Sequence, residues 1–91
     1  MTNARWNVLI EEQVGSREYR EWQLTAIRAA GDERGAAERL AEKLSSSYAP
    51  RHPMSPQGRA RFRTADGWVV VVDGAMSQFR FRLTVAEHIP D

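Results

Sequence analysis

Apolar and polar side chains alternate in two segments at the start of the chain, and this alternation predicts two β-strands. The segments are residues 5–14 (RWNVLIEEQV) and 18–28 (EYREWQLTAIR), with Gly15 and Ser16 between them. A three-residue loop from Val14 to Glu18 is favoured because it sets apolar residues opposite one another, whereas a slip by one residue would reverse every face. The predicted cross-strand pairs are Trp6 with Ala26, Val8 with Leu24, Ile10 with Trp22, and Glu12 with Arg20.

A helical pattern follows at residues 32–47 (DERGAAERLAEKLSSS), where apolar side chains recur at helical spacing. Asp32 is the predicted N-cap residue, and the serine run followed by Pro50 ends the helix. Residues 49–58 (APRHPMSPQG) hold all but one of the prolines and predict a loop. The apolar stripe of the predicted helix consists of Ala36, Ala37, Leu40, Ala41, Leu44 and Tyr48.

Three further strands are predicted at residues 59–64 (RARFRT), 68–73 (WVVVVD) and 78–86 (QFRFRLTVA). Ala65-Asp66-Gly67 joins the first two strands, and a turn through Asp73-Gly74 joins the last two. The element order is therefore ββαβββ. It predicts an α+β fold in a single domain over residues 1–91, with a five-stranded antiparallel or mixed sheet and one helix packed on one face.

The strand at residues 68–73 is apolar on both faces, whereas its predicted neighbours alternate arginine with apolar residues. A strand of this kind is normally covered on both sides, yet the sequence offers a single helix. Aligning Phe62, Val70 and Phe81 on the helix side leaves two valines bordered by arginines on the other side. We name this predicted surface the arginine–valine face. Its two rows are Arg63–Val69–Arg82 and Arg61–Val71–Arg80.

Three interpretations of the arginine–valine face are open. The arginine stems can lie over the valines with their charged ends in water. The face can bind protein, either a second copy of the chain or a larger partner with an acidic rim. Alternatively, the six arginines of residues 51–82 can bind nucleic-acid phosphates, but sheet surfaces of that type also present exposed aromatic rings for base stacking. Trp68 faces the core if the preceding turn has three residues, and moves to the arginine side if it has two.

Composition narrows these interpretations. The net charge of +1 and the isoelectric point of about 8.3 are weak for a nucleic-acid-binding protein. Arginine supplies all but one of the basic residues, which is typical of a high-GC bacterial chain, and there is no cysteine, which fits a reducing compartment. The first ten residues lack the pattern of a signal peptide, and the apolar run at 68–72 is far shorter than the roughly 20 residues of a membrane helix. The expected location is the cytoplasm, with no membrane segment.

The sequence contains no candidate for catalytic chemistry. His52 and His88 stand in no metal-ligand spacing, and Glu11 and Glu12 point to opposite faces of a strand. No phosphate-binding glycine loop or nucleophile motif is present. The sequence therefore predicts no metal, cofactor or catalytic residue and favours a small non-catalytic interaction module that binds a protein partner or forms a homodimer; the alternative is a nucleic-acid-binding protein. The predicted interaction residues are Arg61, Arg63, Val69, Val71, Arg80 and Arg82.

Overall fold

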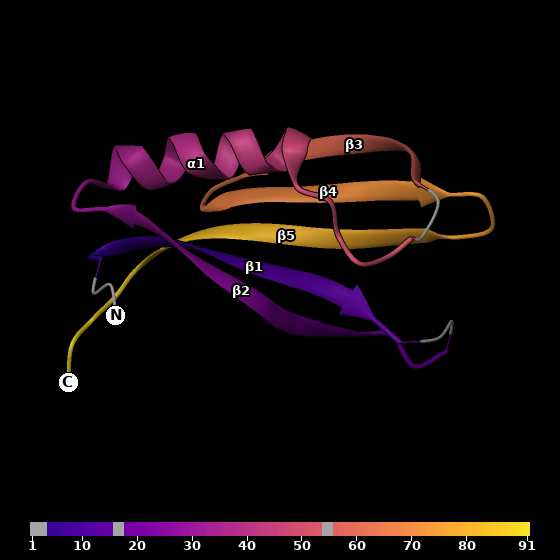
Figure 1. The fold of residues 1–91 in the computed structure, drawn as a ribbon, viewed down its shortest axis with the longest axis horizontal. Coiled ribbons are helices and arrows are strands. Elements are labelled where there is room, and N and C mark those ends of the chain that lie inside the picture. The colour runs from indigo at the N-terminus through magenta and orange to yellow at the C-terminus, as the bar shows by residue number, and fades with distance from the viewer. Residues whose placement is uncertain (1–3, 16–17, 54–55) are drawn as a thin grey trace.

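The computed structural model describes residues 4–15, 18–53 and 56–91 of the chain. Parts of the predicted first turn (Ser16) and of the predicted 49–58 loop (residues 54–55) lie outside the described residues. Within them the chain forms one sheet of five strands and one helix, which confirms the predicted ββαβββ α+β fold (Figure 1). The elements are β1 (Trp6–Val14), β2 (Glu21–Gly31), α1 (Arg34–Ser47), β3 (Pro56–Thr64), β4 (Gly67–Gly74) and β5 (Gln78–Glu87).

The strand order across the sheet is β2-β1-β5-β4-β3, and every neighbouring pair is antiparallel. The pairing of β1 with β5 joins the N-terminal hairpin to the C-terminal three-stranded meander. Because the sheet twists, β1 and β2 run diagonally to β3, β4 and β5 (Figure 1). Because β2 and β3 stand at the two ends of the strand order, they are the edges of the sheet.

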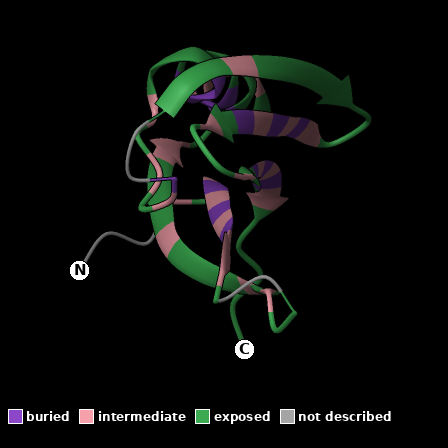
Figure 2. Cartoon of the chain, turned by 90° about the vertical axis from the view of Figure 1, so that its right-hand side faces the viewer, coloured by how far each residue is buried: buried purple, intermediate pink, exposed green. Residues whose placement is uncertain are grey.

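The core lies between α1 and one face of the sheet. The helix packs against β1, β2, β4 and β5, and its Ala37 and Ala41 are fully buried, so their small side chains let the helix approach the strands closely. The central strands alternate between buried and half-buried positions, whereas the edge strands β2 and β3 are exposed over most of their length (Figure 2). The strand residues of the core are Val8, Ile10, Trp68, Val70, Val72, Phe81, Leu83 and Val85.

The helix begins two residues later than predicted. Glu33, not Asp32, occupies the N-cap position, and no side chain caps this end of the helix. The difference arises because β2 continues to Gly31, whose positive φ of 130° turns the chain before the helix begins. At the other end, the Tyr48 backbone N–H donates to the Leu44 carbonyl and closes the last turn.

The predicted register of the first hairpin is wrong. The segment between β1 and β2 has six residues rather than three, and Ile10 lies opposite Ala26 rather than Trp22. An irregularity between Ile10 and Glu11 shifts the register again, so that Glu12 faces Gln23 rather than Arg20. Arg20 lies before β2 and donates instead to the Gln78 carbonyl.

The C-terminal meander has one correct and one incorrect predicted register. As predicted, β4 sets Val69 opposite Arg82 and Val71 opposite Arg80 on β5. The strand β3 begins at Pro56, earlier than the predicted residue 59, and its turn to β4 has two residues, Ala65 and Asp66.

The described part of the chain contains no helix with the length and apolar character needed to cross a membrane.

Candidate interaction surface

The two-residue turn between β3 and β4 changes the composition of the predicted arginine–valine face. Thr64 pairs with Gly67, so Phe62 lies opposite Val69 and Ala60 lies opposite Val71. The rows on the sheet face away from α1 are therefore Phe62–Val69–Arg82 and Ala60–Val71–Arg80. Of the six predicted site residues, Val69, Val71, Arg80 and Arg82 share this face. The predicted positions of Arg61 and Arg63 are wrong, because a shift by one residue moves both to the helix side.

On the helix side, the arginines of β3 contact the C-terminal end of α1 and the core tryptophan. The Arg59 guanidinium donates to the Ser45 and Tyr48 carbonyls at 3.1 and 2.8 Å, and Arg61 donates to the Ser45 hydroxyl at 2.9 Å. Cations at this end complement the helix dipole and its unpaired carbonyl groups. The Arg59 and Arg61 side chains therefore fasten β3 to the end of the helix.

Trp68 does lie on the side of the β3 arginines, as the two-residue turn requires. The guanidinium carbons of Arg61 and Arg63 are 5.0 and 5.4 Å from the centre of its ring. However, Trp68 is only 9% exposed, because this side of the sheet is covered by the helix. Trp68 is therefore a core residue with two guanidinium groups over its ring, and the ring is not exposed for stacking with a nucleic-acid base.

The face away from α1, which we call the open face, is not covered by any described element. It carries two apolar bands separated by polar residues on the central strand β5 and on β1, where Asn7, Glu11 and Gln13 share this face. Three of the band residues are more than half exposed: Leu24 at 53%, Ile27 at 59% and Phe62 at 56%. The β1/β2 band consists of Leu9, Trp22, Leu24 and Ile27; the β3/β4 band consists of Ala60, Phe62, Val69 and Val71; the polar row consists of Arg80, Arg82 and Thr84.

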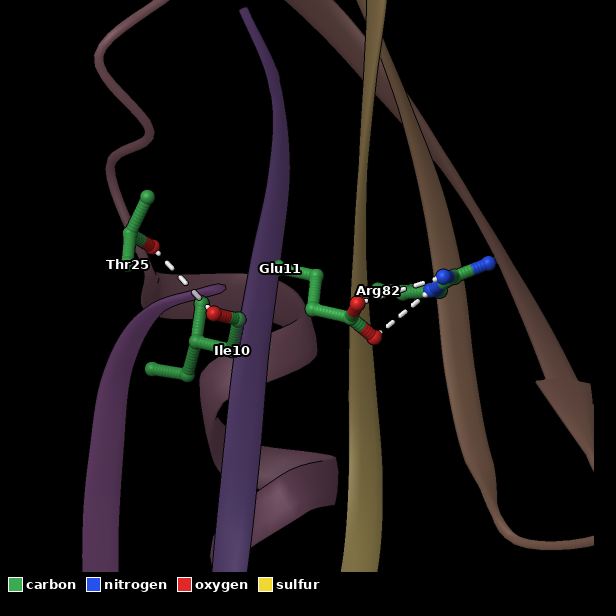
Figure 3. Close-up of polar contacts among 4 residues, drawn as sticks. All are labelled: Ile10, Glu11, Thr25 and Arg82. Atoms are coloured by element: carbon green, nitrogen blue, oxygen red, sulfur yellow. Dashed lines mark hydrogen bonds and ion pairs between the residues drawn. The ribbon is translucent and has the colours of Figure 1, made fainter. Parts of the chain in front are cut away.

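An ion pair occupies the middle of the open face. The Arg82 guanidinium donates to both carboxylate oxygens of Glu11, from Nε at 2.8 Å and from Nη2 at 3.2 Å (Figure 3). This bond lowers the pKa of Glu11 and raises the pKa of Arg82. The same guanidinium lies 4.3 Å over the ring of Trp22, so the charge is held between a carboxylate and an aromatic face. Of the two arginines in the polar row, Arg82 is therefore already neutralised within the chain.

Glu12 is a buried polar residue that the sequence interpretation missed. Its side chain is on the helix side, 4% exposed, and its carboxylate accepts hydrogen bonds from the Thr25 hydroxyl at 2.9 Å, from the Arg51 backbone N–H at 2.8 Å and from the Tyr48 hydroxyl. Burial, together with the bond to Glu12, raises the pKa of Tyr48. Glu12 thus connects β1 to β2, to the end of α1 and to the following loop. The sequence does carry a signal for this burial, because Glu12 continues the alternation of the core-facing residues Val8 and Ile10.

A shallow groove of about 360 Å³ lies between the first half of α1 and the β3–β4 turn. Three of its charged residues pair with one another: Arg34 is 3.3 Å from Glu38 and 3.7 Å from Asp66. No cluster of three or more histidine, aspartate or glutamate side chains suited to hold a metal ion occurs among the described residues. Of the two histidines, His52 stacks on Phe79 with ring centres 5.1 Å apart, and His88 is exposed.

The chain matches no protein-family model, and no curated protein and no solved structure is significantly similar to it. The functional interpretation therefore depends on the geometry and chemistry of the open face and of the sheet edges.

Proposed function

We propose that this chain is a small, non-catalytic interaction module that forms a homodimer through the open face, in the cytoplasm of a bacterial cell. The observation that carries the proposal is the exposure of large apolar side chains on both halves of one sheet face, with no described element over them. Monomeric proteins rarely leave large contiguous apolar areas in water. Sheets that have such a face usually pack it against a second layer.

The arrangement of the open face favours a second copy of the chain as the covering layer. The apolar bands lie on opposite sides of the polar residues of β5 and β1, one toward each edge of the sheet. A two-fold rotation about an axis parallel to β5 sets the β1/β2 band of one protomer on the β3/β4 band of the other. The polar rows then meet each other at the axis. Apolar surface meets apolar surface in this geometry, as a self-complementary two-fold interface requires.

The charges on the open face support the same choice. Glu11 neutralises Arg82, so the face carries one further arginine, Arg80, rather than the four arginines of the predicted face. The two-fold geometry leaves one like-charge contact, between Arg80 and the Arg80 of the second copy near the axis, which weakens the dimer but is a single pair. A strongly basic face would instead favour an acidic partner.

The size of the face sets the expected strength of the dimer. Five strands span about 24 Å and six residues along each strand about 20 Å, so two protomers bury about 1,000 Å² together. Stable interfaces typically start at about 1,200 Å², and crystal contacts are mostly below about 800 Å². We therefore expect a dimer that dissociates on dilution in the micromolar range rather than an obligate one.

Sedimentation equilibrium over a hundredfold concentration range tests the proposal. The wild-type protein should change from monomer to dimer, and Leu24→Glu and Val71→Glu, one in each apolar band, should remain monomeric. Met76→Glu is the matched control, because Met76 is an equally apolar residue, 89% exposed, at the β4–β5 turn. Circular dichroism confirms that each variant is folded. A wild-type protein that is monomeric at millimolar concentration would contradict the proposal, and so would dimers that both variants leave intact.

Nucleic-acid binding is the alternative proposal, and the structure divides its six arginines. Arg59, Arg61 and Arg63 lie on the helix side of β3, Arg80 and Arg82 lie on the open face, and Arg51 lies between α1 and β3. A monomeric protein that binds single-stranded oligonucleotides with a steep salt dependence would favour this alternative over the homodimer.

A further inference from the structure

The edge strand β3 has a charge pattern found in no other strand of the sheet. Residues 56–64 (PQGRARFRT) contain three arginines and no aspartate or glutamate. In the described chain, Arg59, Arg61 and Arg63 form no ion pair with a carboxylate; Arg59 and Arg61 donate to neutral oxygens, and the rest of their positive charge is open to solvent. The outer edge of the sheet is therefore positively charged along about 13 Å, the length of five residues.

The backbone of the same three arginines faces the open edge. Residues of an antiparallel strand bond alternately to the neighbour on one side and on the other. Thr64 and Gly67 close a two-residue turn, so the β3 residues that bond to β4 are Thr64, Phe62 and Ala60. The Gly74 N–H donates to the Ser77 carbonyl, so the even-numbered residues of β4 bond to β5. The odd-numbered residues of β4 therefore bond to β3, which gives the same assignment for the β3 residues. The N–H and C=O groups of Arg59, Arg61 and Arg63 are thus left to pair with a further strand.

A second copy of the chain is a poor partner for this edge. In an antiparallel β3–β3 pair the arginines of the two copies lie opposite one another on the same face, and like charges directly opposite are destabilising. The other edge, β2, supplies one acidic residue, Glu21, and one basic residue, Arg28, so it does not complement three arginines. The charge of β3 favours an acidic strand from a different protein.

We infer that β3 binds an extended acidic segment of a partner protein by adding it to the sheet as a sixth strand. Main-chain bonds to residues 59, 61 and 63 provide the pairing, as in other cases of strand addition. Acidic residues at alternate positions of the segment lie beside the three arginines on the helix side. The intervening positions are apolar and lie beside Ala60 and Phe62 on the open face. This inference does not depend on the homodimer, because it uses the edge of the sheet and not its face.

A synthetic peptide tests the inference directly. The probe is a fluorescein-labelled nine-residue peptide in which glutamate alternates with valine, added to the full chain and followed by fluorescence anisotropy. Three control peptides should not bind: one with lysine in place of glutamate, one with the glutamates and valines in separate blocks, and one with alternate backbone nitrogens methylated. Binding of the methylated or of the block peptide with the affinity of the probe would overturn the inference, because the first cannot form the main-chain bonds and the second cannot place its glutamates on one side of the strand.

Hydrogen exchange measured by NMR locates the peptide on the sheet. The amide protons of Arg59, Arg61 and Arg63 should exchange at least about tenfold more slowly when the peptide is bound. Those of Ala60 and Phe62 serve as internal controls, because they already bond to β4. Slower exchange on β2, or on none of these residues, would place the peptide elsewhere and overturn the inference.

A charge reversal on the edge provides the matched variants. Arg63→Glu should weaken peptide binding about tenfold, because it replaces one attractive cross-strand pair by a repulsive one. Arg28→Glu on the opposite edge makes the same change in net charge and should leave the affinity unchanged. Equal weakening by both variants would indicate a general charge effect and contradict strand addition. An oligothymidine of similar charge could also displace the peptide. If it does, and if the peptide itself does not slow the amide exchange of Arg59, Arg61 and Arg63, the edge binds nucleic acid and the inference is overturned.

Discussion

Replacement of Glu12 by glutamine should destabilise the fold more than any other single exchange of a carboxylate for an amide among the described residues. The Glu12 side chain is 4% exposed, and it accepts hydrogen bonds from Thr25, Tyr48 and the Arg51 backbone. Glutamine has nearly the same shape, so the exchange leaves no cavity. It removes the negative charge and turns one acceptor oxygen into a donor group.

The magnitude follows from the three bonds. Hydrogen bonds to a charged group contribute about 1.5–3 kcal/mol each, and neutral ones about 0.5–1.5 kcal/mol. Loss of the charge therefore weakens each bond by about 1 kcal/mol, and the hydroxyls of Thr25 and Tyr48 reduce the total by rotating to accept from the new amide. We expect a loss of about 2 kcal/mol. This is a large part of the roughly 5–14 kcal/mol expected for a domain of 91 residues.

Urea unfolding followed by tryptophan fluorescence measures this loss. With a slope of about 1 kcal/mol per molar urea for a small domain, the midpoint should fall by about 2 M. Glu38→Gln is the matched control, since Glu38 is an exposed helix residue paired with Arg34, and its midpoint should shift by less than about 0.5 M.

The result that refutes this reasoning is a Glu12→Gln midpoint as close to wild type as that of the control. A double-mutant cycle with Tyr48→Phe adds a second test. The two changes share one hydrogen bond, so their combined cost should be smaller than the sum of the single costs by at least about 0.5 kcal/mol. Additive costs would mean that the Tyr48 hydroxyl and the Glu12 carboxylate do not interact in solution.

Three further predictions follow from named contacts. The raised pKa of Tyr48 stabilises the fold below the ordinary tyrosine pKa of about 10, and this contribution is lost as the pH rises through the pKa of the folded protein. A Tyr19→Phe protein keeps Tyr48 as its one tyrosine, so its tyrosinate absorbance should appear only above the pH at which a free tyrosine titrates. The lowered pKa of Glu11 contributes at neutral pH and is lost as the pH falls through the folded value, so Glu11→Gln should cost about 0.5–1 kcal/mol at pH 7 and progressively less in acid by urea unfolding. Gly67→Ala should prevent folding by circular dichroism, because the added Cβ would lie 1.8 Å from a backbone oxygen of β5, whereas Gly58→Ala meets nothing within 4 Å and should be tolerated.

Periodicity was sufficient to predict the type and order of the elements, because alternation and helical spacing are properties of each segment alone. Register was not predictable in the same way, since it depends on turn length. The segment 68–73 and its partner 78–86 have a correct register because apolar residues on both strands agree on one alignment. Between β3 and β4, the sequence pattern predicts Gly67 in the turn, whereas Gly67 belongs to the strand, and this one residue exchanges the faces of Phe62 and Arg63.

The pairing of β1 with β5 joins segments about 75 residues apart, and nothing local in either strand specifies it. Only the pairing of β1 with β5 brings Glu11 beside Arg82, so the ion pair on the open face has no signature in the sequence. Glu12 is a different case, because its core-facing phase was visible. It was not recognised as buried because its partners Tyr48 and Arg51 come from a distant part of the chain.

The two proposed surfaces share one residue, and this determines which variants distinguish them. Phe62 belongs to the edge strand β3 and also to the open face, so a change at this position would affect a covering protomer and an added strand alike. Leu24 and Arg63 do not have this ambiguity. Leu24 is on the open face at the far edge of the sheet, four strand positions from β3, whereas Arg63 points to the helix side. Loss of self-association in Leu24→Glu with intact peptide binding, and the reverse in Arg63→Glu, would therefore establish that one small sheet uses its face and its edge independently.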